Sequence, residues 1–240
     1  MRGTSMLAIP LIALGIAIAP SGARAANLIQ NGGFEDPTVG GGSYQTIGVG
    51  SGALPFWTIV GNPGNNVDLV QTAYSEDPPN GVSPFNAYEG LNSLDLTGNG
   101  NVGTAVGIQQ SVATVVGRQY TLSFFVGRAT PREGYTGFHA YDGDATVDLS
   151  LDGGVTRLSF TNSNSTPGQI DWQAFSHTFT AIDTTTLISF YNGTPLIPPA
   201  NFAGLDDVRL EAVPEPASVA MLASGALGLA FLRFARRRAA

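Results

Sequence analysis

Two adjacent carboxylates stand out near the end of the chain, in the segment GLDDVRL at residues 204–210. Val208 and Leu210 follow the two-residue period of a strand, so we expect both to face the core. Counting back by two places Asp206 on that inward side and Asp207 on the outward side. An ionised carboxylate on an inner face is costly unless it is paired or bound to a metal. Because the chain has no Lys and few Arg, bound Ca²⁺ is one solution. Water at a rim position and hydrogen bonds from backbone amides are the alternatives.

Other patterns that could carry catalysis are sparse. The absence of Cys excludes thiol catalysis and Cys metal sites. The two histidines, His139 and His177, are 38 residues apart and have no partner pattern. The run GNGNVG at 98–103 matches a dinucleotide fingerprint, but a strand-like segment follows where the fingerprint needs a helix. We therefore predict a protein that is not an enzyme. A polysaccharide-acting hydrolase stays open as an alternative, because its two carboxylates need only lie about 5–10 Å apart in space.

Two long loop-like segments, 71–90 and 128–143, are rich in aromatic and polar residues. Sugar binding needs aromatic faces and a few directed polar groups, and loops often carry such sites. Segment 128–143 is the first choice, because there the two kinds of residue lie close together. The alternative is that its aromatic residues only hold the loop in place. The candidates in this segment are Arg132, Tyr135, Phe138, His139, Tyr141 and Asp142, with Trp57, Tyr74 and Tyr88 elsewhere. Trp57, within LPFWTIV, is more typical of a core residue.

Alternating apolar residues, rather than helical spacing, run through the middle of the chain. In QYTLSFFVG, for example, Tyr120, Leu122 and Phe124 share one face of a strand. Asp152-Gly153 is predicted to turn a hairpin. Asp95 alternates with apolar neighbours and is expected to be solvated; a role as a further Ca²⁺ ligand is the alternative. Many short strands separated by turns predict an all-β protein with a single jelly-roll β-sandwich domain. The expected strands cover 54–60, 67–70, 91–97, 105–112, 119–127, 146–151, 155–160, 170–180, 185–191 and 204–211.

The N-terminal end reads as a targeting segment. A basic residue, an apolar run over 6–19 and small residues at 23 and 25 are typical of a signal peptide over 1–25; a retained anchor is the alternative. The remaining domain, 26–213, has five arginines against seventeen acidic residues, a formal charge of −12. Such a charge repels phosphate backbones, so nucleic acid is not expected as a partner.

The C-terminal end, 214–240, begins with Pro-Glu-Pro, and its prolines should end the last strand. The uncharged run at 217–232 would measure about 24 Å as a helix, and about 28 Å if it continues to Ala235. That is marginally enough to cross a bilayer about 30 Å thick. The arginines that follow would stay cytoplasmic. The residues of this pattern are Pro214, Glu215, Pro216, Arg233, Arg236, Arg237 and Arg238.

Two resemblances cover almost the whole chain. NLIQNGGFEDP at 27–37 and FAGLDDVRL at 202–210 resemble the opening and closing motifs of the choice-of-anchor C family. VDLV (67–70), GLNSLDLTGNG (90–100) and GIQQSVATVVGRQYTLSFFVG (107–127) fit that family in order. This resemblance implies a galactose-binding-like jelly roll, similar to carbohydrate-binding modules, with its first and last strands adjacent. It also implies structural Ca²⁺ between Glu35 and Asp206. Asp207 departs from the family, which more often has Asn there.

The second resemblance concerns the tail, which looks like a PEP-CTERM sorting signal. It implies recognition by an exosortase in the inner membrane of a Gram-negative bacterium, then cleavage and delivery to the cell surface or the outside, often alongside exopolysaccharide. A permanent single-span anchor is the alternative. The expected function is a non-catalytic surface protein that binds extracellular polysaccharide. A structural matrix or surface protein without a specific ligand remains a second possibility.

Overall fold

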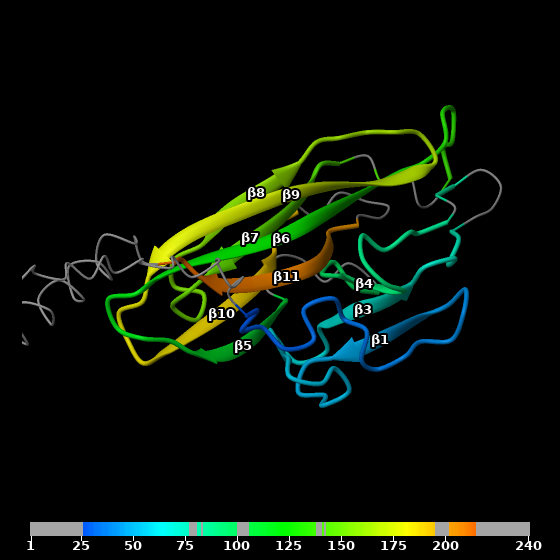
Figure 1. Ribbon diagram of the computed structural model, residues 1–240. Helices are drawn as coiled ribbons and strands as arrows, with labels where there is room; N and C mark the ends of the chain where they lie inside the picture. The colour runs from blue at the N-terminus through cyan, green and yellow to red at the C-terminus, as the bar shows by residue number, and fades with distance from the viewer. Residues whose placement is uncertain are drawn as a thin grey trace, which may run out of the picture.

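The computed structural model describes residues 26–76, 81–82, 84–99, 106–137, 141, 143–194 and 202–214. These residues form two antiparallel sheets packed face to face (Figure 1). In spatial order, the six-stranded sheet contains β1 (Tyr44–Gly48), β3 (Asn66–Gln71), β4 (Asn92–Asp95), β11 (Gly204–Ala212), β6 (Gln119–Thr130) and β9 (Gln169–Thr180). The five-stranded sheet contains β2 (Thr58–Val60), β5 (Gly107–Ala113), β10 (Thr185–Asn192), β7 (Ala145–Ser150) and β8 (Leu158–Asn162). The predicted all-β jelly-roll sandwich is confirmed.

The two ends of the chain were predicted to be targeting segments that are not part of this domain. The proposed signal peptide, 1–25, lies outside the described residues, as does the tail from Glu215 onward, with Pro216 and the arginines Arg236, Arg237 and Arg238. Within the ranges that are described, no helix is long and apolar enough to cross a membrane.

The main core lies between the two sheets and follows the alternation read from the sequence. Leu122, Phe124 and Phe190 have no exposed surface, and each packs in this cluster. Burying one such side chain stabilises the fold by about 1.5–3 kcal/mol. Trp57 also belongs here: its ring lies 5.8 Å from that of Phe34, and only 3% of the residue is exposed. The interpretation of Trp57 as a core residue is confirmed.

A second, smaller core covers the outer face of the six-stranded sheet. Its buried members are Val70, Val82, Phe85, Ala129, Tyr141 and Phe202. They come from β3 and β6, from the two segments that the sequence marked as long loops, and from the residues just before β11. Val82, Phe85 and Tyr141 thus pack described parts of these loops onto the sheet.

The hairpin between β7 and β8 is wider than predicted. The strands do pair, but residues 151–157 separate them. Asp152 accepts hydrogen bonds from the Thr156 N–H and the Ser150 hydroxyl, which closes a loop instead of a two-residue turn. Strand β1 was not predicted, because exposed Gln, Thr and Tyr residues leave it no apolar alternation.

Candidate functional site

A β-bulge in β11 changes the face on which Asp206, the first of the two adjacent carboxylates, lies. Asp206 pairs with Phe125, and Arg209 pairs with Ser123, so β11 contains one extra residue between these pairs. Phe125 and Ser123 alternate with the fully buried Phe124 and therefore face away from the main core. The prediction that Asp206 faces inward was therefore wrong, because the extra residue resets the two-residue period. Its burial, however, was predicted correctly.

Asp206 is buried because residues 88–92 cover it. Its Oδ2 accepts hydrogen bonds from the backbone N–H groups of Tyr88 (2.8 Å) and Glu89 (3.0 Å). Its Oδ1 accepts one from the Asp207 N–H at 2.7 Å. Glu35 acts on the same segment, and its Oε1 accepts from the N–H groups of Leu91 and Asn92, both at 2.8 Å. Two carboxylates from opposite ends of the chain thus fix one loop.

This pair suits a hard cation in the kind of atom it offers. Asp206 has no exposed surface, and burial raises its pKa to about 7 against the opposing backbone donors. No basic side chain of the described residues forms an ion pair with it. A methyl group at Gly33 would lie 3.9 Å from Glu35 Cγ and 4.0 Å from Asp206 Oδ1, so both side chains border that glycine. Among the described residues, no three His, Cys, Asp or Glu side chains are arranged to hold a metal ion, so further ligands would have to be carbonyl or water oxygens.

The covering loop also borders an open depression of about 540 Å³ on the outer face of β11, β6 and β9. Tyr88 projects from the loop, and its ring stacks on Phe125 with the ring centres 3.4 Å apart. Tyr88 nevertheless remains 47% exposed, so part of the residue is accessible to a ligand. The lining residues are Tyr88, Ser123, Phe124, Phe125, Ala174, Phe175, Ser176, Asp207 and Arg209.

A charged network forms one side of this depression. Arg209 Nε donates to Asp207 Oδ1 at 2.6 Å, and its Nη2 donates to Glu89 Oε2 at 3.0 Å. A hydrogen bond with Asp207 raises the pKa of Glu89, although Arg209 acts in the opposite direction. Asp207 has a φ of 47°, a left-handed conformation that the bulge imposes. The network presents guanidinium donors and carboxylate acceptors side by side.

Trp172, on β9, lies next to this depression along the strands, two residues from Ala174. It pairs with Gly127, which in turn pairs with Gly204, so two residues without side chains lie beside the indole. A Cβ at Gly127 would come within 2.7 Å of the Trp172 ring, and one at Gly204 within 2.9 Å. The indole Nε1 donates to the Asn86 carbonyl at 2.9 Å, which fixes the ring.

The structure separates the sugar-binding residues predicted in 128–143. Tyr141 is 8% exposed and packs edge-on against Phe85 in the second core. Tyr135 is half-buried, whereas Arg132 is exposed. Phe138, His139 and Asp142 lie outside the described residues.

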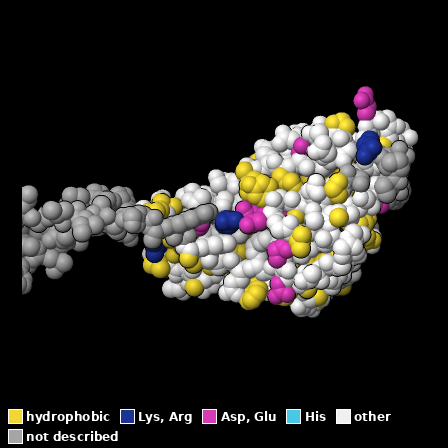
Figure 2. Space-filling view, turned by 45° about the vertical axis from the view of Figure 1, so that its right-hand side comes forward, with side chains coloured by type: hydrophobic (Ala, Val, Ile, Leu, Met, Phe, Trp, Pro, Cys, Tyr) yellow, Lys and Arg dark blue, Asp and Glu magenta, His cyan; other side chains and the backbone are white. Residues whose placement is uncertain are grey.

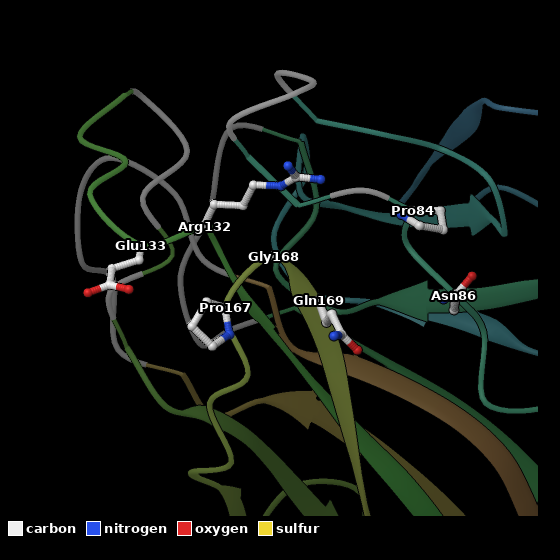
Figure 3. Close-up of a pocket in the computed structure, with 7 residues that line it drawn as sticks. All are labelled: Pro84, Asn86, Arg132, Glu133, Pro167, Gly168 and Gln169. Carbon is white, nitrogen blue, oxygen red and sulfur yellow. The ribbon is translucent and has the colours of Figure 1, made fainter.

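Arg132 lines a separate depression of about 570 Å³, in which its side chain reaches toward the Pro84 segment (Figure 3). The other lining residues are Asn86, Glu133, Pro167, Gly168 and Gln169. Arg132 and Tyr141 therefore do not converge on one ligand surface.

A further pair of carboxylates lies under the second core. Asp68 on β3 is directly opposite Asp95 on β4, and their exposed fractions are 7% and 8%. The expectation that Asp95 is solvated was wrong, because the long connections cover this face. Asp95 accepts from the Thr97 and Ala203 N–H groups, and the Oδ1 of Asp68 has no hydrogen-bond partner. Burial, with a smaller effect of the nearby Asp68, raises the pKa of Asp95 to about 7.

Two protein-family models together match almost the whole chain. The HpiC1-like family, described as HpiC1 cyclase, matches residues 25–211, and a PEP-CTERM protein-sorting motif matches 212–238. Halomucin from Haloquadratum walsbyi (strain DSM 16790 / HBSQ001) is 27% identical over 177 residues. This match covers 72% of the chain but spans only 2% of halomucin.

Solved structures with a similar arrangement include carbohydrate-binding modules. A CBM4 module is 17% identical, with a TM-score of 0.38, and the match covers 77% of this chain and 99% of the module. The CBM22-1 xylan-binding domain from Paenibacillus barcinonensis is 16% identical, with a TM-score of 0.38, and the match covers 74% of this chain and 99% of that domain.

Sequence reasoning did not find the Tyr88–Arg209 depression as a site, although Tyr88 was one candidate. Phe125, Asp207 and Arg209 belong to strands that look ordinary in the sequence. One signal was available: FF at 124–125 breaks strict alternation and places a large aromatic residue on the outer face.

Proposed function

This chain belongs to the HpiC1-like family and carries a PEP-CTERM protein-sorting motif, and we propose that it binds extracellular polysaccharide once it is exported and sorted to the cell surface. The observation that supports this most is the depression beside Tyr88. Sugar rings present flat C–H faces to aromatic rings and hydroxyl groups to charged side chains. Tyr88 and the Arg209–Asp207–Glu89 network offer both kinds of contact, and the open shape suits a polymer.

The finer steps of sorting belong to the same proposal. An exosortase-type enzyme in the inner membrane of a Gram-negative bacterium recognises Pro214, Glu215 and Pro216. The apolar run that follows holds the protein in that membrane until cleavage.

Replacing Tyr88 by Ala is expected to lower polysaccharide affinity about tenfold, because a stacking contact contributes about 1.5 kcal/mol. The measurement is a glycan array followed by affinity electrophoresis on residues 26–213. Tyr88→Phe keeps the ring and should bind almost as wild type does.

Arg132→Ala tests the other depression in the same assay. Loss of binding in Arg132→Ala but not in Tyr88→Ala would move the site to the 128–143 segment. If the wild type binds no glycan better than an unrelated acidic domain does, the protein is a structural surface protein.

A cyclase is the second candidate function. The family to which the chain belongs is described as HpiC1 cyclase. In addition, Glu89 and Asp207 share a hydrogen bond beside aromatic rings. Such a pair can hold a proton for an acid-assisted ring closure. A hydrolase finds less support at this pair, since glycosidase carboxyl groups lie about 5–10 Å apart.

Ring closure with return of the proton conserves mass. The cyclised product then has the same mass as its linear substrate. Small-molecule extracts of a strain that produces the wild-type chain should contain this isomer, and extracts of a strain that produces Asp207→Asn should lack it. If the two profiles are identical, the cyclase candidate is rejected.

We also propose that Ca²⁺ binds between Glu35 and Asp206. Its support is the buried carboxylate of Asp206, which accepts backbone hydrogen bonds but forms no ion pair with a basic side chain of the described residues, and the oxygen-only character of the pair. Bound there, Ca²⁺ would supply the missing positive charge, and the two side chains would continue to hold residues 88–92.

A further inference from the structure

The end of the sandwich at which the chain leaves the domain carries three exposed aliphatic side chains. Val115 and Val116, in the turn between β5 and β6, are 57% and 59% exposed. Ile182, in the turn between β9 and β10, is 93% exposed. We call these three residues the apolar tip. In Figure 2, hydrophobic side chains gather at the left-hand end of the domain, with a basic side chain among them.

The two turns that form the apolar tip are joined by hydrogen bonds. The Gly117 N–H donates to the Ala181 carbonyl at 2.8 Å, and the Ala181 N–H donates to the Arg118 carbonyl at 2.9 Å. Thr114 adds a third link, because its N–H donates to the Thr184 carbonyl at 2.9 Å. The three aliphatic side chains therefore stand on one braced surface.

The last strand ends beside this surface. Ala212 pairs with Tyr120, and the Val213 N–H donates to the Gln119 carbonyl at 2.9 Å. Gln119 directly follows the turn that carries Val115 and Val116. Figure 1 shows β11 running toward the same end of the sandwich as the β5–β6 and β9–β10 connections.

The sequence allows little distance between this exit point and the apolar run. Residue 217, where the run begins, is four residues beyond Val213, and four extended residues span at most about 14 Å. If the run lies in a bilayer, the apolar tip must lie within about that distance of the lipid surface.

We propose that the apolar tip docks onto the lipid bilayer while the tail is inserted, so that the domain sits on the membrane in one orientation. This proposal rests on the membrane-held state in the proposed function. We assign this surface to lipid for two reasons. The point where the chain leaves the domain brings the apolar tip close to the bilayer, and aliphatic side chains partition into the membrane interface. Arg118, exposed in the same turn, is placed to meet a lipid phosphate. Asp183, the neighbouring carboxylate, is directed to the Thr184 N–H at 2.6 Å.

This orientation would leave the polysaccharide face, which lies along the side of the sandwich, open to the space outside the membrane. The twelve residues of β6 span roughly 36 Å. Arg132 and the Pro84 depression lie beyond the far end of β6, and the Tyr88 depression lies along it. A polymer outside the membrane could then reach both surfaces while the protein is still anchored.

The natural absence of Cys provides a direct test, because any single Cys is a unique labelling site. Full-length Val116→Cys and Ile182→Cys would carry an environment-sensitive dye and be reconstituted into phosphatidylcholine vesicles that contain brominated lipids. Thr136→Cys, exposed at the opposite end of the domain, is the matched control. We expect a blue shift and loss of fluorescence at positions 116 and 182, and neither effect at 136.

The other possible results distinguish a failure of the lipid contact from a failure of the anchored state. Vesicle flotation with equal fluorescence at all three positions would overturn the lipid contact and leave the anchored state intact. A chain that does not float with vesicles would overturn both, whereas glycan binding would still be decided by its own assay. Energy transfer between copies labelled at Val116→Cys, without quenching by lipid, would assign the tip to a second copy and also overturn the proposal.

Discussion

Replacing Asp95 by Asn is expected to stabilise the domain near pH 8 and to flatten the pH dependence of its unfolding free energy. Asp95 is 8% exposed and lies opposite Asp68, and burial raises its pKa from 3.8 to about 7. Its protonated form is therefore the one that the fold prefers. Asn resembles that neutral form in shape and keeps an oxygen for the Thr97 and Ala203 N–H groups.

The domain should lose stability as the pH rises, because the pKa of Asp95 is raised in the folded state. A raised carboxyl pKa means that the folded state binds the proton more tightly than the unfolded state does. The stabilisation is complete below about pH 4 and is lost as the pH rises to about 7. At about 1.4 kcal/mol for each unit of pKa, the wild type should lose roughly 4 kcal/mol across this window through Asp95. Asp206, also raised to about 7, should leave a residual slope in Asp95→Asn.

Urea unfolding of the wild type and Asp95→Asn between pH 4 and pH 8 measures this effect. Asp152→Asn is a control of opposite sign, because hydrogen bonds from Thr156 and Ser150 lower the pKa of exposed Asp152 to about 2. Parallel stability curves for the wild type and Asp95→Asn would contradict the prediction.

Replacing Asp206 by Ala is expected to lower the melting temperature strongly. The change removes the acceptor of three backbone N–H groups, from Tyr88, Glu89 and Asp207. Each buried donor left unpaired costs about 1–3 kcal/mol. A total near 3 kcal/mol corresponds to a fall of roughly 6–12 °C in a domain of this size. Because Tyr88 loses its support, glycan affinity should fall as well.

Chelation separates this hydrogen-bond role from the proposed Ca²⁺ site. EDTA is expected to lower the melting temperature of the wild type but not of Asp206→Ala. Glu35→Gln keeps an oxygen for the Leu91 and Asn92 N–H groups and loses the charge, so it should lose the EDTA response while the loop stays in place. Equal responses in the wild type and Asp206→Ala would remove Asp206 from the metal site.

Particular residues show how far the sequence could be trusted. Strands β6, β9, β10 and β11 were predicted closely, because alternating apolar residues must share one buried face. The same counting failed at Asp206, where one extra residue reverses the face, and at Asp95, where loops bury a second face. Burial by a distant loop leaves no period in the strand that it covers.

The sequence alone determined the all-β class and the main core, because both depend on local alternation, and it predicted a targeting segment at each end from composition. The tertiary structure decided which side chains meet. Only folding brings Glu35 and Asp206 onto one loop, stacks Tyr88 on Phe125 and places three aliphatic residues from two turns beside the exit of β11. These contacts join residues distant in the chain, and their geometry depends on strand order and on a bulge that period-two counting does not detect.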